Sequence, residues 1–431
     1  MTTKTHMPFG DKNAMKEMAA GLFAAHMTRN SGVLNNLVGK MPRGTGGAAA
    51  TIRKQTTQHM PVVRVEDLGK GRGDEVEFHL IQPVNAKPIM GSRNASGRGV
   101  GMKITGNRLR VDQARFPVAL PDTMSSIRNP YDLRSLGRPV AQSLADRYID
   151  QSNLVHMAGA RGFHNNIEWI VPTENDPEFA EIMVNEVRAP SKNRHFIADG
   201  GNGIKPFEVT GDEVDLTSAD LMKMDTIDGI ATTMEQIALP PPPVKFEGDA
   251  AADDHPLRVL LVSPAQYSSF SQDPAFRQLQ AASLARAQVA KMHPLFLNDA
   301  GLWNNTLIVK MPKPIRFYAG DNIQYCASYS ELTESTCKAP AALGTTHAID
   351  RAILLGGQAI MEAYASSEHS GIPYFWSEEK TDHGDKHEIL IGMIRAASKV
   401  QFLIDHGHEK QVTDYGCTAI DTVVKIIGAR Q

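Results

Sequence analysis

The sequence predicts a globular protein of mixed α and β structure, and three observations support that prediction. The chain has 431 residues, of which 42% are hydrophobic and 22% charged, and these values exclude a fully disordered, collagen-like or coiled-coil protein. Residues 74–80 alternate between polar and apolar side chains, as a half-buried strand does, whereas residues 130–158 carry apolar side chains at helical spacing. The length favours two or three domains.

The chain carries no sign of export or of a membrane span. No stretch has enough consecutive uncharged apolar residues to cross a bilayer, and Met1–Thr28 lacks an apolar block followed by a small-residue cleavage site. Cys326, Cys337 and Cys417 are too few, and odd in number, to build a disulfide framework. We therefore expect free thiols in a reducing cytoplasm.

Charge is distributed unevenly along the chain. The net charge is −3, but residues 1–115 hold 18 Lys and Arg against 8 Asp and Glu, whereas residues 116–431 hold 27 against 40. A basic front can neutralise phosphates, or it can bind the acidic body of another copy, and both attractions weaken with salt. Solvated surface charge is the third interpretation, and composition alone leaves all three open.

The first 60 residues have the pattern of an extended arm. One helix is expected at Ala14–Thr28, followed by Gly-, Thr- and Arg-rich sequence such as Gly44–Gly47.

Two strands that follow the arm predict one long hairpin. The first begins at Asp74, and the second runs from Met102 to Val111. In the second strand the apolar positions change parity between Ile104 and Leu109, so we expect a bulge or a bend near Gly106-Asn107.

The connection between these strands, Gln82–Gly101, is rich in glycine and carries Lys87, Arg93 and Arg98. A stretch of about 20 residues without periodicity is uncommon inside a compact domain. We expect it to be ordered by a partner outside its own fold; the alternative is a mobile surface loop.

The strongest helix signal covers Pro130–Ala158, where apolar residues form a stripe about 120° wide. Asp132 gives an acidic first turn and Gly159 a stop, while Pro139 is expected to kink the helix or to mark its true first turn.

The rest of the chain predicts a mixed body without internal repeats. Irregular structure is expected from Phe163 to Gly211, and a stiff linker at Pro240–Pro243. The expected helices are Thr217–Gln236, Pro274–Lys291 and Ile349–Ala365, and the expected strands are Arg258–Val262, Leu307–Val309, Glu388–Ile404 and Val412–Ile427.

The sequence contains no convincing catalytic motif. Walker A, GxSxG and HExxH patterns are missing, and the glycine sets at 69–73 and 97–101 open no helix after a buried strand. A metal could bind at Asp382, His383, Asp385 and His387, completed by His406 and His408, but an ordinary polar turn before a strand is favoured. Cys326 and Cys337 could meet across a hairpin, although nearby cysteines that could complete a zinc site are lacking. The sequence therefore assigns no catalytic, cofactor-binding or metal-binding residue, and favours a structural or binding role.

In their order along the chain, several motifs resemble the HK97-type fold of tailed-phage major capsid proteins, and more specifically the major capsid family of N4-like phages. The hairpin carries two of them, Glu66–Gly71 with Asp74–Val76, and Lys87–Gly91. The other matching segments are Asp150-Gln151, His156–Gly162, Pro264–Tyr267, Asp273-Pro274, Pro294–Phe296, Gly301–Asn304, Leu354–Ala359, Tyr415-Gly416 and Asp421-Thr422.

The resemblance implies an α+β fold with an N-terminal arm, an extended β-hairpin loop, a long spine helix in a peripheral domain and a mixed axial domain. The implied division is residues 1–60 for the arm, 61–117 for the extended loop, 118–215 for the peripheral domain with the spine helix at 130–160, 216–385 for the axial domain, and 386–431 for C-terminal strands that return to both domains.

The resemblance also implies a structural protein, not an enzyme and without cofactors. Hexamers and pentamers of the chain would form an icosahedral head around double-stranded DNA, assembled in the bacterial cytoplasm and present in the virion. Partners would be other copies, scaffolding, portal and decoration proteins, and packaged DNA through non-specific contacts, with no membrane. We expect subunit contacts at Arg93, Arg98, Arg108 and Arg110.

Two other functions remain as alternatives. A nucleic-acid-binding protein using the basic N-terminal quarter would bind DNA with a steep salt dependence. A metal-dependent enzyme would retain metal through His383 and His387.

Overall fold

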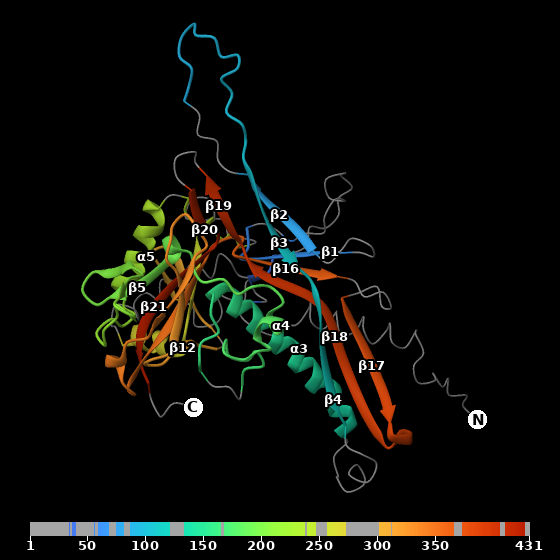
Figure 1. The fold of residues 1–431 in the computed structure, drawn as a ribbon. Coiled ribbons are helices and arrows are strands. Elements are labelled where there is room, and N and C mark those ends of the chain that lie inside the picture. The colour runs from blue at the N-terminus through green and yellow to red at the C-terminus, as the bar shows by residue number, and fades with distance from the viewer. Residues whose placement is uncertain are drawn as a thin grey trace.

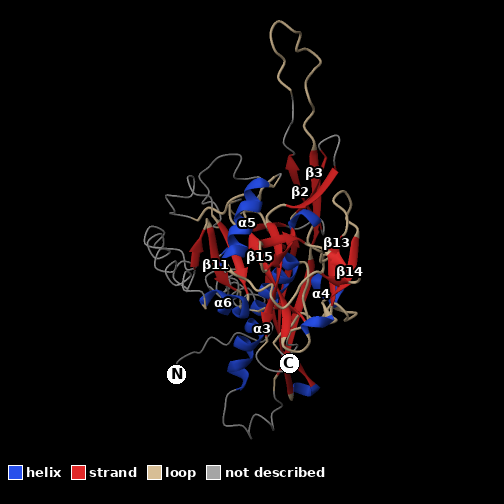
Figure 2. Ribbon diagram, turned by 90° about the vertical axis from the view of Figure 1, so that its left-hand side faces the viewer, coloured by secondary structure: helices blue, strands red, loops and turns tan. Residues whose placement is uncertain are grey.

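The structure is a computed structural model, and it describes fourteen parts of the chain. These are residues 34, 37–39, 56, 59–68, 75–81, 87–120, 133–164, 168–237, 239–246, 257–272, 301–311, 313–365, 373–405 and 410–426. Figure 1 shows a compact body from which one hairpin projects, and the hairpin also stands clear of the body in the turned view of Figure 2. Among the described residues, no helix is both long and apolar enough to span a bilayer.

An eight-stranded sheet forms the centre of the body. Its strands, in spatial order, are β10 (Gly301–Trp303), β11 (Thr306–Lys310), β9 (Arg258–Val262), β15 (His347–Leu355), β21 (Cys417–Lys425), β5 (His195–Asp199) and β6 (Gly203–Pro206), while β12 (Ile315–Phe317) pairs with β15.

Both faces of this sheet are buried. In β9, Val259 and Leu261 join one hydrophobic cluster, and Leu260 and Val262 join another on the opposite face. The second cluster includes four side chains of α5 (Met224–Gln236), which therefore covers that face. Full burial stabilises each such side chain by roughly 1.5–3 kcal/mol, which explains the uninterrupted apolar run of β9.

A second sheet contains β1 (Val62–Leu68), β16 (Ile360–Ala365), β18 (Lys386–Lys399) and β17 (Tyr374–Thr381), with β4 (Asp112–Ala119) on part of β18. The 26-residue helix α3 (Leu133–Ala158) packs against β18 and β4. Its length agrees with the predicted helix, but it begins six residues before Pro139. Pro139 therefore does not mark the first turn.

The remaining elements are short or peripheral. They are the ribbon β2 (Glu75–Ile81) with β3 (Ile104–Arg110), the ribbon β19 (Gln401–Asp405) with β20 (Lys410–Asp414), the sheet of β13 (Asn322–Cys326), β14 (Glu334–Lys338), β8 (Glu213–Val214) and β7 (Val209–Thr210), the helices α4 (Phe179–Met183) and α6 (Pro264–Ser271), and the 3-10 turns η2 (Lys192–Arg194), η4 (Ala341–Leu343) and η5 (Asp382–Gly384).

A buried ion pair crosses the centre of the large sheet. Arg351 of β15 faces Asp421 of β21 and binds both of its carboxylate oxygens, at 2.7 and 2.9 Å. His195 of β5 lies 2.8 Å from the same carboxylate. Burial alone would raise the pKa of Asp421, but Arg351 and His195 hold it well below its usual range. Arg351, Asp421 and His195 therefore tie β15, β21 and β5 together.

A second buried cluster joins three strands of the other sheet to α3. Glu362 of β16 accepts hydrogen bonds from Arg64 of β1 at 2.9 Å, from Arg395 of β18 at 3.1 Å, and from Asn153 of α3. Although burial would raise the pKa of Glu362, Arg64 and Arg395 lower it to about 2. The carboxylate is therefore ionised and fully enclosed, and it connects four elements.

Four sequence-based expectations are wrong. Ile349–Ala365 forms β15 and β16 instead of a helix, because both strands are buried on both faces and so lack the alternation that identifies a strand. Residues 163–211 are not irregular throughout, since they supply β5 and β6. The helix expected from Thr217 begins at Met224.

Finally, β2 and β3 pair without a register shift, so no bulge occurs near Gly106. Ile104 is exposed because it lies on the outer face of the hairpin.

Other expectations are confirmed or cannot be compared. Strands are present at Arg258–Val262 and at Thr306–Lys310, and β18 to β21 supply the C-terminal strands. The three cysteines are free and buried, and burial raises the pKa of Cys337 to about 12. The helices expected at Ala14–Thr28 and Pro274–Lys291 lie outside the described residues.

Candidate interaction surface

The predicted hairpin is present as β2 paired with β3. The pairing runs in continuous register from Glu75 opposite Arg110 to Ile81 opposite Ile104. Leu109 is fully buried on the inner face, with Val76 and Phe78 partly buried beside it. The alternation read from the sequence therefore identifies the face that packs on the body.

The root of the hairpin is fixed to the ribbon β19–β20. Thr105 donates from its hydroxyl to the Leu403 carbonyl at 3.0 Å, and Asn107 donates from its amide to the Gln401 carbonyl at 3.1 Å. The rings of Phe78 and Phe402 meet edge to face, with their centroids 6.0 Å apart. These contacts set the direction in which the hairpin leaves the body.

Beyond this root, residues 87–103 form a loop that extends away from the body (Figure 1). Gly91 and Gly97 have φ values of +70° and +79°, which favour glycine at these turns. A Cβ atom added at Gly99 or Gly101 would meet nothing within 4 Å. The loop therefore makes few contacts with its own chain.

The loop and the adjoining strand ends expose apolar side chains. The exposed fractions are 71% for Met90, 72% for Met102 and 64% for Ile104, with Val100 and Ile81 also more than half exposed. Several such side chains in one projecting segment indicate a contact with another molecule.

The four arginines expected at subunit contacts occupy two places. Arg93 and Arg98 lie in the loop with exposed side chains, and within the described part of the chain neither forms an ion pair. Arg108 and Arg110 lie on the outer face of β3, where Arg108 pairs with Glu77 at 2.8 Å and Arg110 approaches Asp112 at 3.8 Å. The structure therefore does not gather the four into one cluster.

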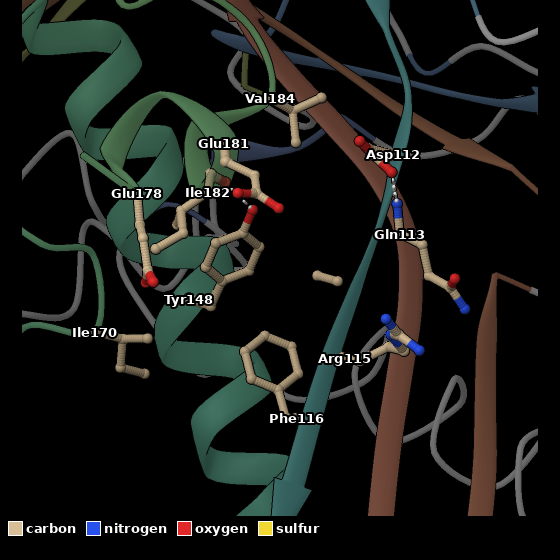
Figure 3. Close-up of a pocket in the computed structure, with 11 residues that line it drawn as sticks. Asp112, Gln113, Arg115, Phe116, Tyr148, Ile170, Glu178, Glu181, Ile182 and Val184 are labelled. Atoms are coloured by element: carbon tan, nitrogen blue, oxygen red, sulfur yellow. Dashed lines mark hydrogen bonds between the residues drawn. The ribbon is translucent and has the colours of Figure 1, made fainter. Parts of the chain in front are cut away.

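A groove of about 580 Å³ lies below the hairpin, between β4, α3 and the segment around α4. Figure 3 shows Phe116 and Tyr148 at its base, with Glu178 and Glu181 on one side and Asp112 and Arg115 on the other. The Tyr148 hydroxyl donates to the Ile182 carbonyl at 2.7 Å, so this polar atom needs no ligand. The groove was not predicted from the sequence, although residues 174–186, which form one of its sides, are rich in Asp and Glu.

Asn185, at the end of this groove, binds the backbone where β3 becomes β4. Its side chain accepts from the Arg110 N–H at 2.9 Å and donates to the Arg110 carbonyl at 2.9 Å. The preceding Val184 has φ +65° and ψ −54°, and the Asn185 N–H donates to the Met183 carbonyl across it at 2.7 Å. This is a strained γ-turn, and a β-branched residue rarely adopts it. The turn directs Asn185 toward the hairpin.

The segment around Asp382, for which the sequence left metal binding as an alternative, forms a hairpin turn, as the favoured interpretation predicted. Asp382–Gly384 forms η5, which connects β17 to β18, and Lys386 pairs with Asp382 at 3.0 Å. In the residues that the structure describes, no group of three or more His, Cys, Asp or Glu side chains is placed to hold a metal.

The chain matches a family model and several solved structures. A family model described as phage capsid protein matches residues 6–426. Among solved structures, the capsid of Ralstonia phage GP4 aligns with a TM-score of 0.65 at 22% identity, covering 86% of this chain and 89% of that one. The capsid of cyanophage Pam1 aligns at 0.56 and 14% identity, with coverages of 87% and 90%. That of Helicobacter pylori bacteriophage KHP30 aligns at 0.53 and 10%, with 86% and 89%. The search of curated proteins gives no match.

Proposed function

The chain belongs to the phage capsid protein family, and from this premise we propose that its copies form hexamers and pentamers that close into an icosahedral shell around double-stranded DNA. Membership makes it a major capsid protein of the phage head, a structural protein of the virion that assembles with copies of itself, with the HK97-type α+β fold. The capsomer types, the shell symmetry and the enclosed DNA belong to the proposal.

One observation carries this proposal, namely the loop at residues 87–103. The loop extends from the body, exposes Met90 and Met102, and carries four cations without a carboxylate. A segment with this composition gains stability by burying its apolar side chains against another copy. We infer that it crosses a neighbouring subunit, and that Arg93 and Arg98 contact carboxylates there.

Arg108 and Arg110 belong to the same proposed contact. Their side chains are 71% and 65% exposed on the outer face of β3. Arg108 pairs with Glu77, and an exposed ion pair of this kind stabilises the fold by only about 0–1 kcal/mol. Arg108 can therefore leave Glu77 for a carboxylate of a neighbouring subunit with little loss of stability.

We also propose the division of the chain into arm, extended loop, peripheral domain, axial domain and C-terminal strands at the boundaries given above. With these boundaries, α3 would belong to the peripheral domain, and β9, β11 and β15 of the eight-stranded sheet would belong to the axial domain. Glycines at 97–101 would let the loop swing when a precursor shell expands, whereas those at 69–73 lie outside the described residues.

The narrower relationships are proposals as well. Motifs such as Lys87–Gly91 support membership of the N4-like subfamily. The excess of Lys and Arg in residues 1–115 supports non-specific contacts with packaged DNA. Scaffolding, portal and decoration proteins are the further partners that such a shell would require.

Negative-stain electron microscopy combined with sedimentation tests the proposal. The purified chain is examined alone and after co-expression with other head proteins of its phage. Closed shells, tubes or rings of six and five subunits are expected. A dispersed monomer under every condition would contradict the proposal.

A further inference from the structure

We propose that the groove between β4, α3 and the α4 segment binds a small organic cation, namely a linear aliphatic molecule with two or more ammonium groups, such as spermidine. Two features of the groove carry the inference, its aromatic base and its negatively charged rim. The site lies within one chain, so the inference goes beyond the proposed function and does not depend on shell formation.

The base of the groove is aromatic. The rings of Phe116 and Tyr148 have their centroids 5.5 Å apart and their planes tilted by 57°, and both lie between β4 and α3 (Figure 3). The Tyr148 hydroxyl donates to the Ile182 carbonyl at 2.7 Å, so the phenol is held in place and offers a ligand its ring instead of its oxygen. Aromatic rings attract ammonium groups through their π faces, and their apolar surfaces also pack against methylene chains.

The rim of the groove carries net negative charge. Its charged groups are three carboxylates and one cation, a balance of −3 + 1 = −2, and they belong to Asp112, Glu178, Glu181 and Arg115. Asp112 is partly engaged, because it lies 3.8 Å from Arg110. Glu178 and Glu181 are exposed, and within the described part of the chain neither takes part in an ion pair. Two carboxylates are therefore available to a ligand that carries two positive charges.

The layout of the carboxylates favours an organic cation over a metal ion. A divalent metal needs several oxygen ligands at about 2.0–2.6 Å, and in the described ranges no three His, Cys, Asp or Glu side chains are placed to hold one. Glu178 and Glu181 line one side of the groove and Asp112 the other (Figure 3). Methylene groups separate the charges of an aliphatic diammonium ion, so its chain can lie on the rings while its ends reach the rim.

The volume of the groove also suits such a molecule. It is about 580 Å³, inside the range of about 300–1,000 Å³ for small-molecule sites. Ile170, Ile182 and Val184 add apolar surface to its walls. A neutral hydrocarbon would leave the rim charges uncompensated, and a hydrated metal ion would leave the rings uncovered. An aliphatic ammonium ion satisfies both.

Isothermal titration calorimetry with spermidine tests the proposal on the purified full chain, below the concentration at which it assembles. One variant carries Glu178→Gln with Glu181→Gln, and a second carries Phe116→Leu. We expect the first to weaken spermidine binding by at least ~5-fold, because it removes two exposed ion pairs. The second should weaken it by about threefold, because it removes one cation–π contact. Hydrogen exchange at residues 178–186 should slow when spermidine binds.

A matched control carries Glu208→Gln with Asp212→Asn, which removes the same two charges at exposed positions outside the groove. It should bind spermidine as tightly as the original chain. The control is needed because the acidic excess of residues 116–431 attracts any polycation. Circular dichroism and thermal unfolding check the folding of every variant. If Phe116→Leu does not fold, the carboxylate variant, which changes only exposed side chains, still decides the question.

Three results would overturn the proposal. They are no binding of spermidine by the original chain, equal weakening in the control and in the carboxylate variant, and displacement of spermidine by MgCl₂ at constant ionic strength, which would indicate diffuse charge attraction. Shell formation is measured separately. Loss of the cation site would therefore leave the proposed function intact, and a chain that never assembles would contradict the proposed function without affecting this site.

Discussion

The carboxamide of Asn185 occupies both hydrogen-bonding groups of one backbone unit, the N–H and the carbonyl of Arg110, each at 2.9 Å. Asn185 also donates to the Ala397 carbonyl of β18 at 3.2 Å. A single side chain thus joins the base of the projecting hairpin to the sheet behind it.

Replacing Asn185 with Ala should loosen the hairpin without unfolding the body. The Arg110 groups lose their protein partner, and two hydrogen bonds of about 1 kcal/mol each are removed. Hydrogen exchange of the unassembled chain should therefore become at least ~10-fold faster at residues 104–112, while β9 and β15 keep their protection. Glu208→Ala, at an exposed carboxylate, is the control. Unchanged exchange at the hairpin base would show that Asn185 does not hold it.

Replacing Glu362 with Gln should destabilise the body strongly. Arg64 and Arg395 are buried against this carboxylate, and a neutral amide leaves both cations uncompensated. Removing one partner of a buried ion pair costs about 3–5 kcal/mol, which urea unfolding of the unassembled chain would measure. Glu208→Gln should cost less than about 0.5 kcal/mol. A loss of that small size for Glu362→Gln would mean that the cluster does not stabilise the fold.

Replacing Asp150 with Asn should stabilise the chain at pH 8 and have little effect at pH 3.5. Burial, followed by the charge of Asp146, raises the pKa of Asp150 from 3.8 to about 7. The folded state therefore keeps a proton that the unfolded state has released, so stability falls as pH rises from about 4 to 7. Asn carries no such proton and should add on the order of 2–4 kcal/mol at pH 8. Urea unfolding at both pH values measures the difference, and an equal effect at both would contradict the prediction.

Replacing Gly392 with Ala should disturb the pairing of β17 and β18. Phe375 lies opposite Gly392, and a Cβ atom there would come within 1.9 Å of the Phe375 ring. Overpacking of this kind costs about 1–3 kcal/mol, measurable as a lower unfolding midpoint. Adding Phe375→Leu should recover part of the loss, whereas Gly99→Ala, with nothing within 4 Å, should be neutral. A neutral Gly392→Ala would show that the ring moves aside freely.

Segments with one exposed face could be predicted from the sequence. The hairpin strand at Val76 and Phe78 presents a periodic apolar face, which reports both the element and its orientation. The apolar spacing of the long helix ending at Ala158 predicts the element but not its orientation, because Val140 is half exposed and residues 151–158 are buried on every side. The strand at Ile349–Leu355 could not be identified, because helices and loops cover both of its sides and its run of apolar residues has no period.

The interaction surface could be predicted only in part. The loop is a single continuous segment of unusual composition, so its exposure and its cations are visible in the sequence. The groove combines Phe116, Tyr148 and Glu181 from three distant segments, and its position depends on a γ-turn at Val184 that no residue preference predicts. Long-range packing therefore decides what local patterns leave open.

The near-continuous passage from β3 into β4 also has a mechanical consequence. Only Val111 separates the two strands, and β4 pairs with β18 from Asp112 opposite Arg395 to Ala119 opposite Glu388. Tension applied along the hairpin would load this whole ladder in shear, so its hydrogen bonds would share the force instead of opening one after another. A head pressurised from within could thus transmit strain from one subunit to the next through the sheets.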